Sequence, residues 1–372
     1  MVLRGPLLFG KNVIQEEIIM KMRKIMALGL AVALMGSVVG CGGKQAENVT
    51  EVATEEAEAT ETTDAAEEAT EEVAETAAED GKVYNIGICQ LVQHVALDAA
   101  TQGFEDALTE KLGDAVKFDY QDASGETANC ATIVNGFVSS GVDLIMANAT
   151  APLQAAASAT ADIPVLGTSV TDYATALEIE DWTGVVGNNI SGTSDLAPLD
   201  QQAAMLNELF PDAKTVGLIY CSGEPNSVYQ CTEIEKYLKE YGYDVQWFAF
   251  TDTNDVSSVA QTAADASDVI YIPTDNTAAA NTEAIANVVI PAKVPVVAGE
   301  EGICAGCGVA TLSISYYDLG YSTGLMAAKV LGGEDISKMA VEYAPNVTKE
   351  YNAANCEALG ITIPDDYTAI AE

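Results

Sequence analysis

The sequence predicts an α/β protein of two lobes, each a parallel sheet flanked by helices. Three observations favour this fold class. From residue 82 onward, short apolar runs alternate with longer helical stretches, a pattern typical of βαβ units. The alternation occurs twice, which indicates two doubly wound domains. Small polar or acidic residues follow almost every predicted strand, where open parallel sheets bind ligands.

Residues 1–40 are typical of a secretory signal peptide and are set apart from the folded domains. A basic cluster at 21–24 precedes an apolar run over 25–39, which is short for a transmembrane helix and is followed at once by polar chain. Residues 1–19 are interpreted as an upstream mis-start, because Met20 or Met22 would place the basic cluster at the N-terminus.

Val38-Val39-Gly40-Cys41 resembles a bacterial lipobox, which implies that Cys41 is lipidated and becomes the first residue of the mature protein. An ordinary secretory leader with a chance cysteine is the alternative. Residues 41–81 are interpreted as the lipidated cysteine and a disordered acidic tether, since 46–80 hold 14 acidic residues and no basic or aromatic one. The lipobox interpretation places the protein on the extracellular face of the cell membrane, as on a Gram-positive cell surface, anchored by its acyl chains.

The formal net charge of the chain is -40, and the part beyond the tether remains strongly acidic. Nucleic acids and anionic lipids need a basic footprint, so the composition argues against both as partners of the folded part. Beyond Arg23 the sequence contains no arginine. Any anionic group of a ligand must therefore be held by helix N-termini, hydroxyls, amides or a lysine rather than by a guanidinium.

The predicted elements follow the apolar runs and the helical periodicity in chain order. Predicted strands are 83–89, 116–120, 144–146, 164–167, 215–220, 244–250, 268–272, 294–297, one after 308 and one near 339–343. Predicted helices are 96–112, 127–140, 152–160, 195–209, 226–241, 256–264, 278–289, 317–331 and 353–359. We assign 82–190 plus 312–340 to an N-terminal lobe and 191–311 plus 341–372 to a C-terminal lobe.

Seven cysteines remain after Cys41, an odd number at irregular spacing, which does not indicate a disulfide framework. Cys304-x-x-Cys307 leaves three readings open, a local disulfide, a redox pair or half of a metal site, and plain thiols are favoured. No second CxxC and no nearby histidine supports a metal.

Several stretches together resemble the substrate-binding lipoproteins of ABC transporters, with a type I periplasmic-binding-protein fold, and specifically the members that bind tryptophan and related aromatic amino acids. The matching stretches are 86–98, 147–150, 167–172, 222–227, 273–277, 299–302 and 316–320. Val95 stands where the family usually has proline, and Cys221 where asparagine is more usual. The resemblance implies a ligand between the lobes and hinges near 189–193, 312–316 and 340–343.

A zwitterionic amino acid needs both a cation site and an anion site. We expect Asp275 to hold the ammonium group, with Glu300 as second choice. Hydroxyls and helix N-termini would hold the carboxylate, and each candidate could instead be an ordinary helix cap. The candidate ligand-binding residues are Gln90, His94, Asn148, Thr150, Thr168, Ser169, Ser222, Glu224, Asn226, Ser227, Asp275, Asn276, Glu300, Tyr316 and Asp318.

The favoured function is capture of a small amino-acid-like solute, with an aromatic amino acid as the preferred ligand, by lobe closure for an ABC permease and its ATPase subunits. A sugar- or nucleoside-binding protein of the same fold, or a ligand-sensing surface lipoprotein, is the alternative. A hydrolase or thiol oxidoreductase is disfavoured. His94 and Asp98 could form a catalytic pair, but the sequence has no G-x-S-x-G motif to supply a nucleophilic serine. We expect no catalytic residue, no cofactor, no metal and a monomer.

Overall fold

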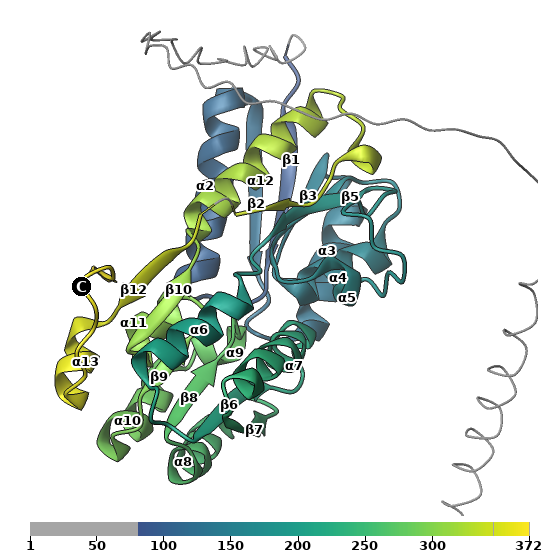
Figure 1. Ribbon diagram of the computed structural model, residues 1–372. Coiled ribbons are helices and arrows are strands. Elements are labelled where there is room, and N and C mark those ends of the chain that lie inside the picture. Colours follow the sequence, from purple (N-terminus) through teal and green to yellow (C-terminus); the bar gives the residue numbers. More distant parts are fainter. Residues whose placement is uncertain (1–80, 345, 372) are drawn as a thin grey trace, which may run out of the picture. The chain divides into compact units, whose positions relative to one another are not determined.

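The computed structural model describes residues 81–344 and 346–371, which form two α/β lobes (Figure 1). The leader, Cys41 and the acidic segment 46–80 lie outside the described residues. Within the described ranges, no helix is both long enough and apolar enough to cross a membrane.

The first lobe is built on a six-stranded sheet in which every pair of neighbours is parallel. Its strands, in spatial order, are β11 (Glu342–Tyr343), β5 (Ile190–Ser194), β4 (Val165–Val170), β3 (Leu144–Asn148), β1 (Tyr84–Gln90) and β2 (Val116–Asp122). β3 and β4 are buried along their whole length, which explains their continuous apolar or small-residue sequences.

The second lobe is built on a seven-stranded sheet, parallel except where β10 meets β12. Its order is β13 (Thr368–Ala369), β12 (Thr348–Tyr351), β10 (Ala310–Ser313), β9 (Val296–Ala298), β8 (Val269–Ile272), β6 (Thr215–Cys221) and β7 (Asp244–Phe250). The two sheets share one topology, because β2-β1-β3-β4 in the first corresponds to β7-β6-β8-β9 in the second. In each, the strand order reverses beside the first strand, which is where open α/β sheets bind ligands.

Helices cover both sheets (Figure 1). Those of the first lobe are α2 (Val95–Leu112), α3 (Thr127–Ser140), α4 (Thr150–Ala159), α5 (Tyr173–Ala176) and α12 (Tyr316–Leu331). Those of the second lobe are α6 (Leu199–Leu209), α7 (Pro225–Glu240), α8 (Val256–Ala266), α9 (Asn276–Ala279), α10 (Thr282–Ala292), α11 (Glu301–Cys307) and α13 (Ala353–Leu359). Short 3₁₀ turns occupy Gly113–Ala115 and Ile336–Lys338.

The two-lobe α/β architecture predicted from the sequence is confirmed, and most elements lie within a few residues of their predicted bounds. Two helices differ. The helix predicted to begin at 195 begins at Leu199, after Pro198, and the helix predicted over 278–289 is two helices, α9 and α10, separated by a break at 280–281. The prediction also lacked β5, β12, β13, α5 and α11.

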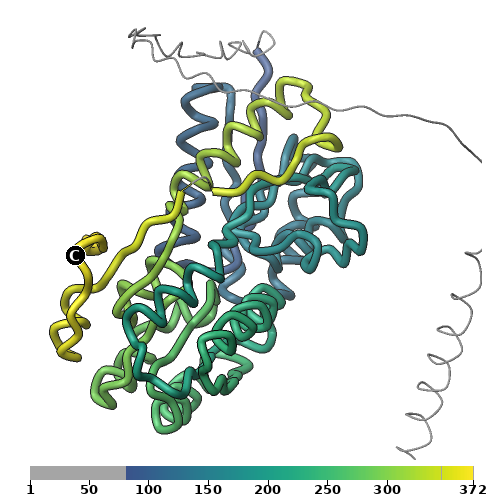
Figure 2. Tube along the Cα trace, viewed as in Figure 1, coloured from purple at the N-terminus to yellow at the C-terminus, as the bar shows by residue number. Residues whose placement is uncertain are grey.

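The chain passes between the lobes three times, as the trace in Figure 2 shows. In the structure, the strand before each passage ends a few residues beyond the lobe boundary assigned from the sequence. β5 continues the first lobe to Ser194, β10 continues the second lobe to Ser313, and β11 returns the chain to the first lobe as far as Tyr343.

Helices α2 and α12 approach each other at backbone distance in the first lobe. A Cβ atom added to Gly320 would lie 1.9 Å from the carbonyl oxygen of Ala100, and one added to Gly103 would lie 2.1 Å from that of Tyr317. Glycine at these two positions therefore permits the contact. The two helices bury the apolar side of the sheet formed by Ile86, Ile88 and Met146, so α12, although late in the chain, is part of the first lobe.

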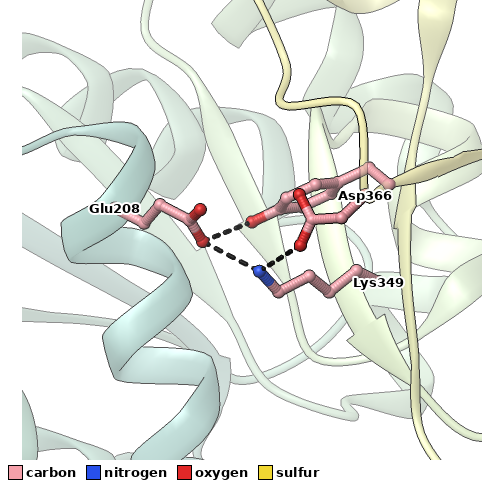
Figure 3. Close-up of polar contacts among 4 residues, drawn as sticks. Glu208, Lys349 and Asp366 are labelled. Atoms are coloured by element: carbon pink, nitrogen blue, oxygen red, sulfur yellow. Dashed lines mark hydrogen bonds and ion pairs between the residues drawn. The ribbon is translucent and has the colours of Figure 1, made fainter.

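The C-terminal segment returns to the second lobe and is attached there by polar contacts (Figure 3). Lys349 of β12 lies 3.0 Å from a carboxylate oxygen of Glu208 on α6 and 2.9 Å from one of Asp366. The hydroxyl of Tyr367 also donates to Glu208. These groups are partly exposed, so we attribute the attachment mainly to the burial of Tyr367 and Cys356 in the apolar core of the second lobe.

Candidate ligand-binding site between the lobes

Residues that follow the strands of both sheets meet at a small cavity of about 10 Å³, which is about the room needed by one water molecule. The first lobe and its crossings contribute His94, Ser169, Thr171, Asp195 and Tyr316, with Leu97 of α2. The second lobe contributes Asn226, Thr274, Asp275, Asn276, Ala279 and Glu300. The predicted convergence of strand ends from two lobes on one gap is therefore present in the structure.

Three carboxylates of this cavity are almost completely buried: Asp195, Asp275 and Glu300 are 4%, 1% and 2% exposed. Burial raises the pKa of Asp275 to about 8, with a further contribution from the charge of Glu224, and raises that of Glu300 to about 7. Burial also raises the pKa of Asp195. The lining contains no lysine or arginine side chain among the described residues. The cavity is thus suited to a ligand that brings its own positive charge.

Asp275 and Glu300 each act as a helix cap. The oxygens of Asp275 accept the backbone N–H groups of Ala278, at 2.8 Å, and Cys221, at 2.6 Å. The carboxylate of Glu300 accepts those of Gly302, at 2.6 Å, and Ile303. The capping role considered for each strand-end residue is therefore present at these two, which bind the first turns of α9 and α11 while lining the cavity.

Asp195 has different partners. One of its oxygens accepts the hydroxyl of Thr171 at 3.0 Å, and the other accepts the hydroxyl of Tyr316 at 2.9 Å. Asp195 follows β5 on the first crossing, and Tyr316 begins α12 after the second. Asp195 is the lining carboxylate that sequence reasoning missed, because its environment depends on a tyrosine 121 residues away.

Ser169 offers a polar group that is buried yet unused within the described part of the chain. Its side chain is 6% exposed, and no partner lies within hydrogen-bonding distance of its Oγ atom there. Its φ of 54° lies in the left-handed region, which a serine adopts rarely. Backbone strain of this kind is concentrated at functional sites, and here it accompanies a hydroxyl beside the buried carboxylates.

A second, larger cavity of about 410 Å³ adjoins the first and shares Asn226 and Asn276 with it. We call it the large cavity. Its apolar lining comes from Leu91, Val92, Ala128, Ala151, Pro225 and Ala280. Polar groups at its wall include the side chains of Gln154, Asn281 and Glu224. The pair of cavities thus combines a small polar chamber with a roomier, mixed one.

The lobes touch directly beside the small cavity. The hydroxyls of Thr171, in the first lobe, and Thr274, in the second, lie 3.5 Å apart. The amide of Gln230 donates to both hydroxyls, at 3.3 Å and 2.5 Å. His94 Nε2 lies 3.3 Å from Asn276 Oδ1 across the same gap. These contacts hold the carboxyl ends of the two sheets against each other.

The structure brings eight of the fifteen predicted ligand-binding residues to the two cavities. They are His94, Ser169, Asn226, Asp275, Asn276, Glu300 and Tyr316 at the small cavity, and Glu224 at the large one. Thr171, Thr274 and Asp195 join them and were missed. The rule that residues after strand ends line the cleft could have selected two of them, since Thr171 directly follows β4 and Thr274 lies two residues after β8.

The other seven predicted residues lie outside both cavities. Gln90 and Asn148 form a buried network with Thr101 beneath α2, and Thr168 bonds to Thr193 inside the first sheet. Ser222 donates to the carbonyl oxygen of Phe250. The remaining three are Thr150 in the first turn of α4, Ser227, which is buried beside Asn226, and the exposed Asp318.

The seven cysteines of the described ranges are buried and unbridged. Cys304 and Cys307 lie on α11 within the apolar core of the second lobe, with α10 packed beside it. Burial raises the pKa of the Cys304 thiol well above its usual value, and that of Cys307 as well. Such thiols are weak nucleophiles and weak metal ligands.

Comparison with known proteins agrees with this architecture. The family model described as ABC transporter substrate binding protein matches residues 85–372. A tyrosine-binding protein of Clostridioides difficile (strain R20291) is 36% identical over 263 residues, which cover 70% of this chain and 76% of that protein.

Two solved structures are also similar. An ABC domain in complex with L-Trp from Streptococcus pneumonia has a TM-score of 0.74 and 32% identity, covering 78% of this chain and 100% of that one. The ligand-free, open structure of a substrate-binding protein with adhesive properties from Clostridium difficile has a TM-score of 0.60 and 35% identity, covering 77% and 99%. The expected type I periplasmic-binding-protein fold is confirmed by these likenesses.

Proposed function

The chain belongs to the ABC transporter substrate-binding protein family, and we propose that it captures an aromatic α-amino acid between its lobes for delivery to an ABC permease. One observation carries the proposal: three buried carboxylates, with no cationic side chain in the described lining, surround a cavity at the strand ends of both lobes. An ammonium group neutralises this cluster, and an amino acid supplies one.

Asp195 is the primary acceptor for the ammonium group in this proposal. Its side-chain partners are two hydroxyls. The oxygens of Asp275 and Glu300 already accept backbone N–H groups, at helix starts and, for Asp275, also at the end of β6. Glu300 and Asp275 add negative potential from the second lobe once they ionise, at pH values above their raised pKa values of about 7 and about 8. The buried charges make the attraction strong, because little water screens them.

Ser169 is the first candidate for the carboxylate of the amino acid. Its Oγ atom is buried and has no partner within the described ranges, and it can donate a hydrogen bond. The chain has no arginine beyond Arg23 that could take this role. The large cavity then receives the aromatic side chain, with apolar contact from Leu91, Val92 and Pro225.

Lobe closure is the mechanism that fits these dimensions. A cavity of about 10 Å³ cannot admit an amino acid unless the lobes part. The chain also fits the L-Trp complex better, with a TM-score of 0.74, than the ligand-free, open relative, with 0.60, although the open relative is slightly more identical in sequence. A change of lobe angle at the three crossings accounts for such a difference.

A ligand panel tests the proposal. L-Tryptophan, L-tyrosine and L-phenylalanine, at about one hundred times Kd, should raise Tm by roughly 5–10 °C, because binding only to the folded protein adds about 2.7 kcal/mol of stability. Glycine, glucose, myo-inositol and adenosine serve as controls in the same thermal-shift assay. A shift with a sugar or nucleoside and none with any amino acid would overturn the proposal.

We further propose that Cys41 anchors the protein by lipid to the outer face of the membrane, next to its permease. Cys41→Ser should move most of the protein from the membrane fraction to the medium, because the acyl chains supply the attachment. Gly43→Ser, two residues beyond, is the matched control and should stay with the membrane. Fractionation and immunoblotting measure the result, and membrane retention of Cys41→Ser would contradict the anchor.

A further inference from the structure

His94 is the only histidine of the chain, and its ring crosses from the first lobe to the second. It is the residue immediately before α2, but its side chain does not cap that helix. Instead its Nε2 atom lies 3.3 Å from Oδ1 of Asn276, the first residue of α9. His94 and Asn276 both line the small cavity.

Glu224 determines how the amide of Asn276 is oriented. The Glu224 carboxylate accepts five hydrogen bonds, from Asn226 and from the backbone and side chains of Asn276 and Thr277. Backbone N–H groups, which can only donate, reach both of its oxygens, at 3.0 Å and 2.8 Å. The Asn276 amide must therefore present its NH₂ group to Glu224, at 2.7 Å, and its oxygen to His94.

The orientation of the amide decides the tautomer of the imidazole. An amide oxygen only accepts, so Nε2 of His94 must carry the hydrogen. Burial lowers the pKa of His94, against the opposing effects of Asn276 and of the charges of Glu224 and Asp98, which favours the neutral form of the ring. Nδ1 is then an acceptor, and it is buried with no partner among the residues that the structure describes.

We propose that Glu224 is a positioning residue that acts through Asn276 to hold His94 in its Nε2–H form, so that Nδ1 accepts a hydrogen bond from the ligand. The amino-acid end of this inference rests on the proposed function, in which the ammonium group is the donor that Nδ1 requires. Because His94 belongs to the first lobe and Asn276 and Glu224 to the second, this hydrogen-bond chain forms only when the lobes are together. Lobe closure therefore helps to prepare His94 for the ligand.

Nitrogen-15 NMR of the full chain labelled at histidine tests the positioning directly, because a single imidazole gives an unambiguous spectrum. Without ligand at pH 7.5, the wild type should show Nε2 protonated and Nδ1 unprotonated. In Asn276→Ala and in Glu224→Gln the ring should shift to a mixture of tautomers. Asn135→Ala, exposed on α3 and outside both cavities, is the matched control and should keep the wild-type spectrum.

Calorimetry with L-tyrosine and L-tryptophan tests the ligand end. Asn276→Ala and Glu224→Gln should each bind these amino acids about tenfold more weakly, because a lost hydrogen bond costs about 1.4 kcal/mol. In the wild type, the same ligands should shift the Nδ1 resonance of His94. A wild-type ring protonated at Nδ1, or wild-type tautomer ratios in both variants, would overturn the positioning role. An Nε2–H ring in a protein that binds neither amino acid would leave the positioning intact and reject the proposed function instead.

Discussion

Asp195→Asn should weaken binding of L-tyrosine or L-tryptophan roughly hundredfold or more. Removing one partner of a buried, hydrogen-bonded charge pair costs about 2–5 kcal/mol, because the other charge is left without compensation. Asparagine keeps the size of the side chain, and the hydroxyls of Thr171 and Tyr316 can rotate to suit the new amide. The substitution therefore removes charge with little change in packing. Isothermal titration calorimetry at pH 7.5 measures the effect.

Asp318→Asn is the matched control, since Asp318 lies on the exposed side of the first turn of α12, beyond the cavity lining. Its affinity should equal that of the wild type. If Asp195→Asn binds within threefold of the wild type while remaining folded, the ammonium group lies elsewhere, and Asp275→Ala becomes the variant to compare.

The same variant should alter how affinity depends on pH. Burial raises the pKa of Asp195, Asp275 and Glu300, so each is protonated to a higher pH than an exposed carboxyl group. Only the ionised forms attract an ammonium group, so affinity should rise as pH increases from about 5 to 8. Asp195→Asn should make this rise shallower but not abolish it, because Asp275 and Glu300 still titrate.

Gly320→Ala should lower the free energy of unfolding by about 3 kcal/mol, the largest stability effect that we expect from a single methyl group. The new Cβ atom would lie 1.9 Å from the carbonyl oxygen of Ala100. Both sides of this contact are helix backbone, so relief requires α2 and α12 to move apart. Urea denaturation measures the change.

Gly136→Ala provides the contrasting control on α3. A Cβ atom there would meet nothing within 4 Å, and the residue is exposed in a helix interior. Alanine is favoured over glycine in that setting by about 0.5–1 kcal/mol, so this variant should be slightly more stable than the wild type. Equal effects of the two substitutions would show that α2 and α12 do not approach as described.

The elements predicted best from sequence are those in which local signals and burial agree. The helix predicted over 127–140 has these bounds in the structure, and Gly141 ends it in a left-handed conformation with its N–H donating to Phe137. The strand over 244–250 is likewise as predicted. In both cases residues close in sequence contain the whole signal.

The sequence-based predictions differ from the structure where contacts with residues distant in sequence determine the local structure. Helix α11 contains Gly302 and Gly306, which disfavour a helix, and it forms because the Glu300 side chain caps it and the core of the second lobe covers it. Gln90 follows the rule that strand ends face a cleft, yet its side chain is engaged by Thr101 on α2. Sequence alone cannot specify either contact, since both depend on how the helices pack on the sheets.

The attachment of Tyr316 has a consequence for the order of events during capture. α12 is joined at backbone distance to α2, so Tyr316 travels with the first lobe, as do Asp195 at the end of β5 and Ser169 in β4. The groups assigned to both ends of the amino acid are thus carried by a single body. The amino acid should therefore bind first to the N-terminal lobe while the lobes are apart. Asp275 and Glu300 of the second lobe should contact it only afterwards, when the lobes close.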